Sequence, residues 1–126
     1  MKRVLISMLM AALTLTWSAS ADASIKWVDQ YCSPSGDLCS GLYRNSGRMT
    51  SDLSTFSFRG KYQLCVKAPR ATQDCKRFRL RRANHGILRG RVRLAKHFNL
   101  RRNGRYAVSF YSTGFRVGPA LHFRKR

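Results

Sequence analysis

The sequence predicts an all-β protein, a single antiparallel β-sandwich of about seven strands that follows a secretory signal peptide. Three observations lead to this prediction. Apolar and polar residues alternate over short runs, which is the period of a strand with one buried face. Residues that favour turns, such as Gly, Asn and Pro, separate these runs. Four cysteines behind an export leader indicate a small domain that disulfide bonds stabilise.

Residues 1–23 have the organisation of a secretory signal peptide. A basic start precedes an apolar run of 14 residues, and a stretch of small residues with two overlapping small-x-small cleavage patterns follows. We expect cleavage after Ala23, with Ala21 as the second choice, and one mature domain over residues 24–126. The alternative is a membrane anchor, which needs about 20 apolar residues, more than this run offers.

The remainder of the chain shows the two-residue period of strands and no helical stretch of useful length. Apolar residues occupy even positions both before and after Gly60, so the two strands around it could also be one long bent strand. The alternating runs predict strands near residues 25–31, 39–44, 53–59, 61–67, 75–82, 88–98, 105–111 and 115–124.

The cysteines predict the bridges Cys32–Cys39 and Cys65–Cys75. The second bridge agrees with a hairpin register in which apolar residues face apolar ones and polar residues face polar ones, and it lies on the solvent side of the sheet. The other two connectivities of four cysteines remain open. Zinc is disfavoured, because these spacings differ from the short Cys-x2-4-Cys pairs of structural zinc sites.

Positive charge dominates the composition. The chain has no glutamate, and 18 of its 25 basic residues are arginines. Residues 1–23 hold two basic residues and one acidic residue, so the domain keeps 23 basic and four acidic residues, a net charge of +19. A charge of magnitude ~2–8 is enough to keep a small domain soluble. The excess favours a polyanionic partner, although genome composition can also raise the share of arginine over lysine.

The basic residues concentrate in two predicted strands, 75–82 and 88–98. Alternation places three arginines on one outward face of each strand. We predict that they contact an anionic polymer, an anionic membrane surface or an acidic protein; nucleic acid fits the charge but is not expected as the physiological partner. The six predicted contact residues are Arg77, Arg79, Arg81, Arg89, Arg91 and Arg93.

No motif in the sequence indicates catalysis, a cofactor or a metal. There is no nucleophile elbow, zinc-protease helix or phosphate-binding glycine loop. The scarcity of carboxylates disfavours a glycosidase pair and most metal sites. We therefore predict that the protein is not an enzyme. We interpret the aspartates as turn residues or as solvated partners of the arginines, and the histidines as surface residues or a turn residue: Asp29, Asp37, Asp52 and Asp74, and His85, His97 and His122.

The C-terminal half resembles immunoglobulin-like and fibronectin type III-like sandwiches. Tyr106 follows a glycine-containing turn and opens an alternating strand, as the tyrosine corner of these folds does. The resemblance implies a structural role for this ring, with its hydroxyl bonded to backbone near Leu100. Antibody-type domains are not implied, since Val108 replaces their cysteine and the strand 61–67 has no tryptophan.

Residues 60–123 also resemble small secreted bacterial proteins of uncharacterised function. Their pattern is C-V-x-x-P, a second cysteine, G-x-Y-x-V and G-P-x-L-x-F, which stand here at 65–69, 75, 104–108 and 118–123. The resemblance implies a fold and an export route, and it implies no activity. In a fibronectin-like topology the two arginine strands belong to opposite sheets, so we expect the arginines to coat both faces.

The function predicted from these observations is that of a secreted, non-enzymatic cationic binding module. It would adhere to anionic partners of the cell envelope or surroundings, in the medium, the periplasm or the cell wall. The alternative is an exported protein-interaction factor, an inhibitor or accessory domain for an acidic protein. A hydrolase is the least supported class.

Overall fold

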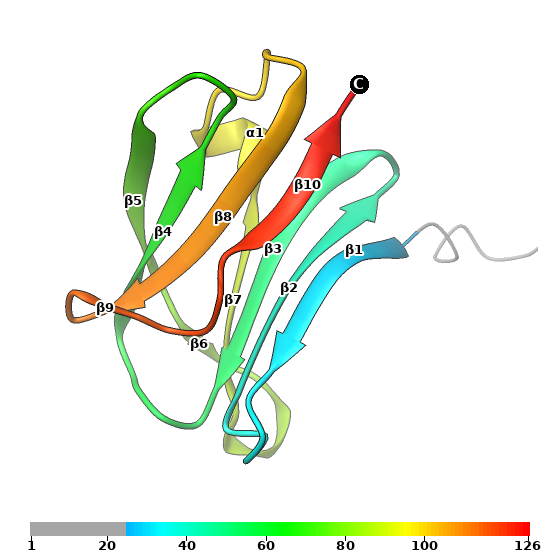
Figure 1. The fold of residues 1–126 in the computed structure, drawn as a ribbon. Helices are drawn as coiled ribbons and strands as arrows, with labels where there is room; N and C mark the ends of the chain where they lie inside the picture. The colour runs from blue at the N-terminus through cyan, green and yellow to red at the C-terminus, as the bar shows by residue number, and fades with distance from the viewer. Residues whose placement is uncertain (1–24) are drawn as a thin grey trace, which may run out of the picture.

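The computed structural model describes residues 25–126, which form a two-layer β-sandwich (Figure 1). The first sheet has the strand order β1-β2-β3-β7-β6, and the second has the order β10-β8-β4-β5, with β9 paired to β8. Every strand pair is antiparallel. The predicted all-β sandwich is confirmed, whereas the predicted signal peptide lies outside the described residues.

Ten strands in the described part of the chain replace the predicted seven or so, because β6 and β9 are short additions of two residues each. The first sheet consists of β1 (Ile25–Cys32), β2 (Leu38–Asn45), β3 (Arg48–Thr55), β7 (Leu88–Arg93) and β6 (Arg81–Arg82). The second consists of β10 (Leu121–Lys125), β8 (Gly104–Ser112), β4 (Lys61–Lys67), β5 (Gln73–Arg79) and β9 (Phe115–Arg116). A 3-10 turn, η2 (Asn84–Gly86), precedes β7, and one helical turn, α1 (Leu94–His97), follows it.

The β4–β5 hairpin has the register that the sequence predicts. Tyr62 faces Phe78, and Cys65 faces Cys75 across the pair. Apolar side chains of β4 therefore point into the sandwich, where β8 covers their other flank. The agreement follows from the period of two, because a slip by one residue would turn every buried side chain to the solvent.

Both predicted disulfide bonds are present, Cys32–Cys39 and Cys65–Cys75. No cysteine among the described residues is free, which excludes zinc binding by these thiols. The second bridge lies on the outer face of its sheet as predicted: Cys75 is exposed, whereas Cys65 on the inner strand of the hairpin is 2% exposed. The bridges close short loops at the β1–β2 and β4–β5 hairpins, which restrains the unfolded chain.

The core lies between the sheets and is built by alternate residues of the central strands. Leu42 and Leu53 from the first sheet meet Tyr62 and Phe110 from the second, and all four are at most 1% exposed. Burial of each such side chain contributes about 1.5–3 kcal/mol to folding. Because this core fixes both sheets, the outward-facing residues occupy defined positions.

Four predicted strands differ from the structure in position. The strand expected at 53–59 is β3, which begins at Arg48 because Ser46 and Gly47 form the preceding tight turn with positive φ angles of 52° and 78°. The residues between β3 and β4 are a loop in which Phe56 is 56% exposed. The bent-strand alternative is therefore wrong: β3 and β4 belong to different sheets.

The other differences arise where a buried residue or a turn interrupts the alternation. The strand expected at 75–82 divides into β5 and β6 around Leu80, which is 6% exposed. The strand expected at 88–98 ends at Arg93, so His97 lies in α1 and not on a strand face. The strand expected at 115–124 divides into β9 and β10 around Gly118, whose φ of 76° makes a turn.

Tyr106 at the start of β8 is 0% exposed and stacks on Phe123, with 4.8 Å between ring centroids. Its hydroxyl donates a 2.7 Å hydrogen bond to the carbonyl of Arg102, two residues closer than the expected Leu100. The bond ties the loop before β8 to the strand that follows it.

We expect Tyr106→Phe to destabilise the domain by about 1 kcal/mol, through loss of the hydrogen bond. Tyr106→Ala should destabilise it by about 3–5 kcal/mol, as truncation of a large core side chain does. The measurement is the urea denaturation midpoint. Tyr111→Phe, at a partly exposed tyrosine of the same strand, is the control, and we expect a change below about 0.5 kcal/mol. Equal midpoints for Tyr106→Ala and the parent would contradict a core position.

Candidate functional site

A cleft at one edge of the sandwich forms where the chain passes from one sheet to the other. Leu80 makes this crossing: its side chain is buried and its N–H donates a 2.7 Å hydrogen bond to the carbonyl of Gly60. The next two residues form β6 and pair with β7 in the first sheet. Arg79 and Arg81, two residues apart, therefore belong to different sheets and lie on either side of the opening.

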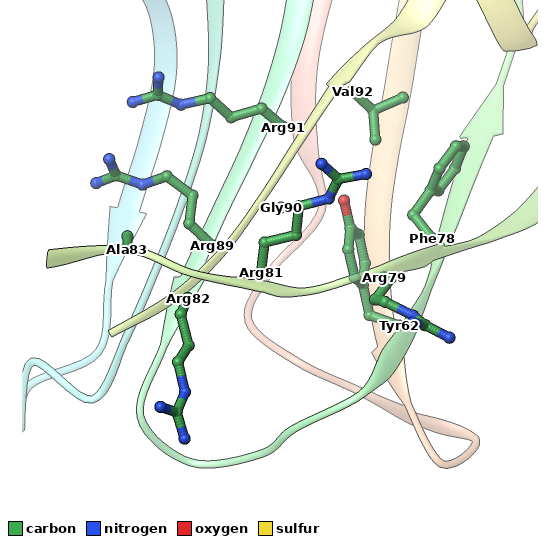
Figure 2. A pocket seen from close by; sticks show the side chains of 10 residues that line it. All are labelled: Tyr62, Phe78, Arg79, Arg81, Arg82, Ala83, Arg89, Gly90, Arg91 and Val92. Atoms are coloured by element: carbon green, nitrogen blue, oxygen red, sulfur yellow. The ribbon is translucent and has the colours of Figure 1, made fainter. Parts of the chain in front are cut away.

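The cleft has a volume of about 520 Å³ and is rich in arginine. Residues of β5, β6 and β7 supply its walls, and Tyr62 of β4 and Gly90 of β7 lie between the two sheets (Figure 2). We call it the arginine cleft. Its lining is Tyr62, Phe78, Arg79, Arg81, Arg82, Ala83, Arg89, Gly90, Arg91 and Val92.

The arginine side chains line the cleft without converging on one point. Figure 2 shows Arg81 turned toward the hydroxyl of Tyr62, whereas Arg89 and Arg91 extend to the opposite side of β7. Arg79 and Arg82 extend in further directions. An arrangement of this kind presents positive charge to a partner over several neighbouring surfaces.

The inner wall of the cleft depends on a close contact between Tyr62 and Gly90. A Cβ at Gly90 would lie 2.5 Å from Cε1 and 2.6 Å from the hydroxyl oxygen of Tyr62, so the ring fits because glycine has no side chain. The hydroxyl is buried and has no hydrogen-bond partner. Burial raises the pKa of Tyr62, and the charge of Asp52 adds to this increase. The phenol therefore stays protonated and can act as a donor.

Positive residues are register partners in the strand pairs beside the cleft. Arg81 of β6 pairs with Arg89 of β7, although the two side chains extend to different sides (Figure 2), and Lys61 of β4 pairs with Arg79 of β5. Like charges at opposed positions of an antiparallel pair are destabilising. A bound anion would relieve this repulsion, and the fold keeps the opposed pairs although no carboxylate lies between them in either register.

Asp52 is the one carboxylate that forms ion pairs within residues 25–126. Its oxygens lie 3.5 Å from Nε of Arg89 and 3.7 Å from Nε of Arg91. Burial raises the pKa of Asp52 above 3.8, and the two guanidinium groups lower it in part. One negative charge beside two positive ones leaves this part of the first sheet cationic.

The structure gathers four of the six predicted contact residues at the cleft and separates the other two. Arg79, Arg81, Arg89 and Arg91 line it, whereas Arg77 lines a different depression beside Tyr111 on the second sheet. Arg93 lies at the end of β7, opposite Thr50. The prediction that the first trio shares one strand face is wrong, because Arg81 belongs to the other sheet. The second trio does share the outward face of β7, since Gly90 and Val92 between its members are buried.

Sequence reasoning missed Arg82 at the cleft. In the predicted strand 75–82, alternation placed Arg82 on the face opposite to the outward arginines. The signal that could have found it is its place in a two-residue strand at the sheet edge, where both parities are exposed. The expectation that the two arginine strands belong to opposite sheets is confirmed for β5 and β7.

Four basic side chains outside the cleft donate hydrogen bonds to backbone carbonyls: Arg44, Lys76, Arg102 and Lys125. Arg44 donates to the carbonyl of Arg124 at 3.0 Å, and Arg102 donates to those of Pro69 and Arg70 at 2.9 and 3.0 Å. These bonds hold the guanidinium groups without neutralising them. The domain therefore keeps its positive charge at the surface.

The remaining acidic and histidine side chains have structural positions. An oxygen of Asp29 accepts a 2.9 Å hydrogen bond from the backbone N–H of His122, which joins the β1 and β10 edges. His85 lies in η2 with a positive φ of 62°. No three His, Cys, Asp or Glu residues come together as a metal site within residues 25–126.

The chain matches no known protein family, no curated protein and no solved structure. In the described residues no helix has the length and apolar character to cross a membrane. The function must therefore be inferred from the surfaces themselves.

We expect Gly90→Ala to destabilise the domain by about 1–3 kcal/mol, because the new methyl group overlaps the buried Tyr62 ring. Tyr62→Phe should be close to neutral, since the hydroxyl it removes has no partner. The double variant should recover part of the loss, which a thermal denaturation cycle would measure. The recovery is only partial because Phe keeps the Cε1 atom, and a Gly90→Ala variant as stable as the parent would contradict the contact.

Proposed function

We propose that the protein is a secreted, non-enzymatic cationic binding module that adheres to anionic partners of the cell envelope or its surroundings. The observation that supports this most directly is the arginine cleft, where five arginines line one opening. Arginine suits this role because its planar group can make two parallel bonds to a phosphate or a carboxylate.

The spread of the guanidinium groups favours an extended polyanion over one small anion. A single exposed pair of opposite charges contributes ~0–1 kcal/mol, so affinity requires several pairs at once. At ~0.15 M salt the screening length is ~8 Å, which limits effective partners to those with closely spaced charges. A polymer that crosses the cleft would meet arginines of both sheets.

Export is the second part of the proposal. The leader over residues 1–23 and the two disulfide bonds support it, because such bonds persist in oxidising compartments. We place the protein in the medium, the periplasm or the cell wall. An anionic membrane surface and an acidic protein remain partners of the same charge class.

A protein-interaction factor is the second candidate function. Two exposed aromatic side chains favour it: Phe115 is 76% exposed at the β8–β9 hairpin, and Phe56 is 56% exposed in the loop after β3. A protein interface with an apolar centre would keep its affinity in salt. Electrostatic binding to a polyanion weakens steeply instead.

We also propose that the sandwich is immunoglobulin-like. Strands β2-β3-β7-β6 have the order A-B-E-D, and β10-β8-β4-β5 have the order G-F-C-C′. The buried Tyr106 at the start of β8 then stands where the tyrosine corner is found, at strand F. Strand β1 is an addition at the edge beside β2.

We expect replacement of Arg79, Arg81 and Arg82 by Gln to weaken binding to inorganic polyphosphate and to flatten its salt dependence, by about one unit of logarithmic slope for each arginine–phosphate pair that the replacement removes. The matched control replaces Arg48, Arg105 and Arg126 by Gln, which removes three exposed charges away from the cleft lining. Retention on a polyphosphate column across a salt gradient measures both.

Elution of the parent below physiological salt would contradict polyanion binding and favour the interaction factor. Equal losses in the two triple variants would contradict the cleft as the binding site, since they carry the same net charge. Circular dichroism should show the same fold for all three proteins, because every replaced side chain is exposed.

A further inference from the structure

The outer face of the first sheet carries a second cavity, of about 390 Å³, beside the arginine cleft. We call it the outer-face groove. Arg89 lines both cavities, so they adjoin. Figure 2 shows Arg89 and Arg91 extending to this side of β7. The groove is lined by Trp27, Gln30, Cys32, Cys39, Ser40, Gly41, Asp52, Ser54 and Arg89.

The strand register places the groove residues in rows across the sheet. One row runs Gln30, Gly41, Asp52 and Arg91 through β1, β2, β3 and β7. Rows of larger groups lie on either side of it: the Cys32–Cys39 bridge with Ser54 and Arg89 on one, and Trp27 with Tyr43, Thr50 and Arg93 on the other. Gly41, which has no side chain, leaves room in the middle row for the ring of Trp27.

Trp27 forms an aromatic wall of the groove in a fixed position. Its six-membered ring lies against Gly41, where an added Cβ would come within 2.4 Å of the indole Cζ3. The Tyr43 ring supports it, with 5.0 Å between centroids. Trp27 nevertheless stays 51% exposed. A tryptophan held on one side and open on the other can bind a flat apolar partner with little loss of side-chain entropy.

Unused hydrogen-bonding groups lie beside this ring. Oδ1 of Asp52 and Nε of Arg89 are buried and have no hydrogen-bond partner, and their 3.5 Å separation is an ion-pair contact only. Asp52 is 8% exposed and lines the groove. Gln30 and Ser54 add neutral donors and acceptors. The groove thus combines an open indole with the polar side chains of Gln30, Ser54, Asp52 and Arg89.

Sugar rings match this combination. A pyranose has C–H groups on its faces, which pack on an indole, and hydroxyl groups around its edge, which bond to carboxylate, amide and guanidinium groups. Arg89 and Arg91 add a preference for a carboxylate on the same ring. We propose that the outer-face groove binds a uronic acid unit of an acidic polysaccharide, whose further units extend into the arginine cleft.

This inference rests on the proposed polyanion binding and names the class of polymer. Polyphosphate supplies charge but no apolar ring face, so it has nothing to pack on Trp27. An acidic peptide would place flexible side chains there, which lose more entropy on binding. The rigid ring of a uronate polymer presents charge, hydroxyl groups and an apolar face together.

Trp27 supplies a direct optical test. The chain has two tryptophans, Trp17 and Trp27, so in a Trp17→Phe chain all tryptophan emission comes from the groove, whether or not residues 1–23 are removed. We expect an oligogalacturonate to change this emission in a saturable way. Inorganic polyphosphate should bind the cleft and leave the emission nearly unchanged.

Calorimetric titration of Trp27→Ala gives the second measurement. Binding of the oligogalacturonate should weaken about tenfold or more, while polyphosphate binding stays as in the parent. Trp27→Tyr should retain most of the affinity, and Phe115→Ala, at an exposed aromatic outside the groove lining, should retain all of it. The methyl-esterified oligomer, which keeps the rings and loses the charges, should bind more weakly than the acid.

Several outcomes separate this inference from the proposed function. If neither polymer binds the parent, polyanion binding itself fails. If both bind but Trp27→Ala leaves oligogalacturonate binding unchanged, or weakens both polymers equally, the sugar site is overturned and polyanion binding stands. Equal binding of the acid and the methyl ester would overturn the role of the arginines toward a carboxylate.

Discussion

The passage of the chain through Leu80 is the constraint on which the arginine cleft depends. One buried side chain and one backbone hydrogen bond to Gly60 end β5 in the second sheet and begin β6 in the first. Without this crossing, the arginines after it would continue along the edge of the second sheet. Because of it, Arg81 pairs with Arg89 of β7. Because the chain crosses between the two sheets here, arginines that are close in the sequence lie on both walls of the cleft.

The scarcity of carboxylates determines how the domain carries its charge. Asp52 offsets part of the charge of the β7 arginines, and Asp29 accepts a hydrogen bond from the backbone N–H of His122 between β1 and β10. A few basic side chains elsewhere bond to carbonyl oxygens, as Arg102 does with the turn after β4. Such bonds satisfy donors and order loops, but they leave the repulsion between cations in place. The proposed anionic partner would therefore stabilise the folded domain, since it would relieve repulsion that the sequence does not relieve itself.

The alternation of buried and exposed residues along each strand explains which parts of the fold were predictable. It fixed the β4–β5 register and the pairing of Cys65 with Cys75, because both depend on residues in one hairpin. It could not reveal a change of sheet, since Arg79 and Arg81 have the same parity on either side of Leu80. The outer-face groove was also hidden, because its residues come from four strands and meet only through the register of the whole sheet.

Two glycines show how the sandwich places aromatic rings beside its charges without using long loops. Gly90 faces inward and makes room for the Tyr62 ring, whereas Gly41 faces outward and makes room for Trp27. Each glycine interrupts a row of side chains within a regular strand, so the backbone pairing continues across it. Asp52, adjacent to Gly41 in the register, is thereby left at the side of a groove rather than under a neighbouring side chain. The positions of both aromatic rings beside the charges are therefore set by glycines within rigid strands, and the proposed sugar site depends on the open side of the Trp27 ring.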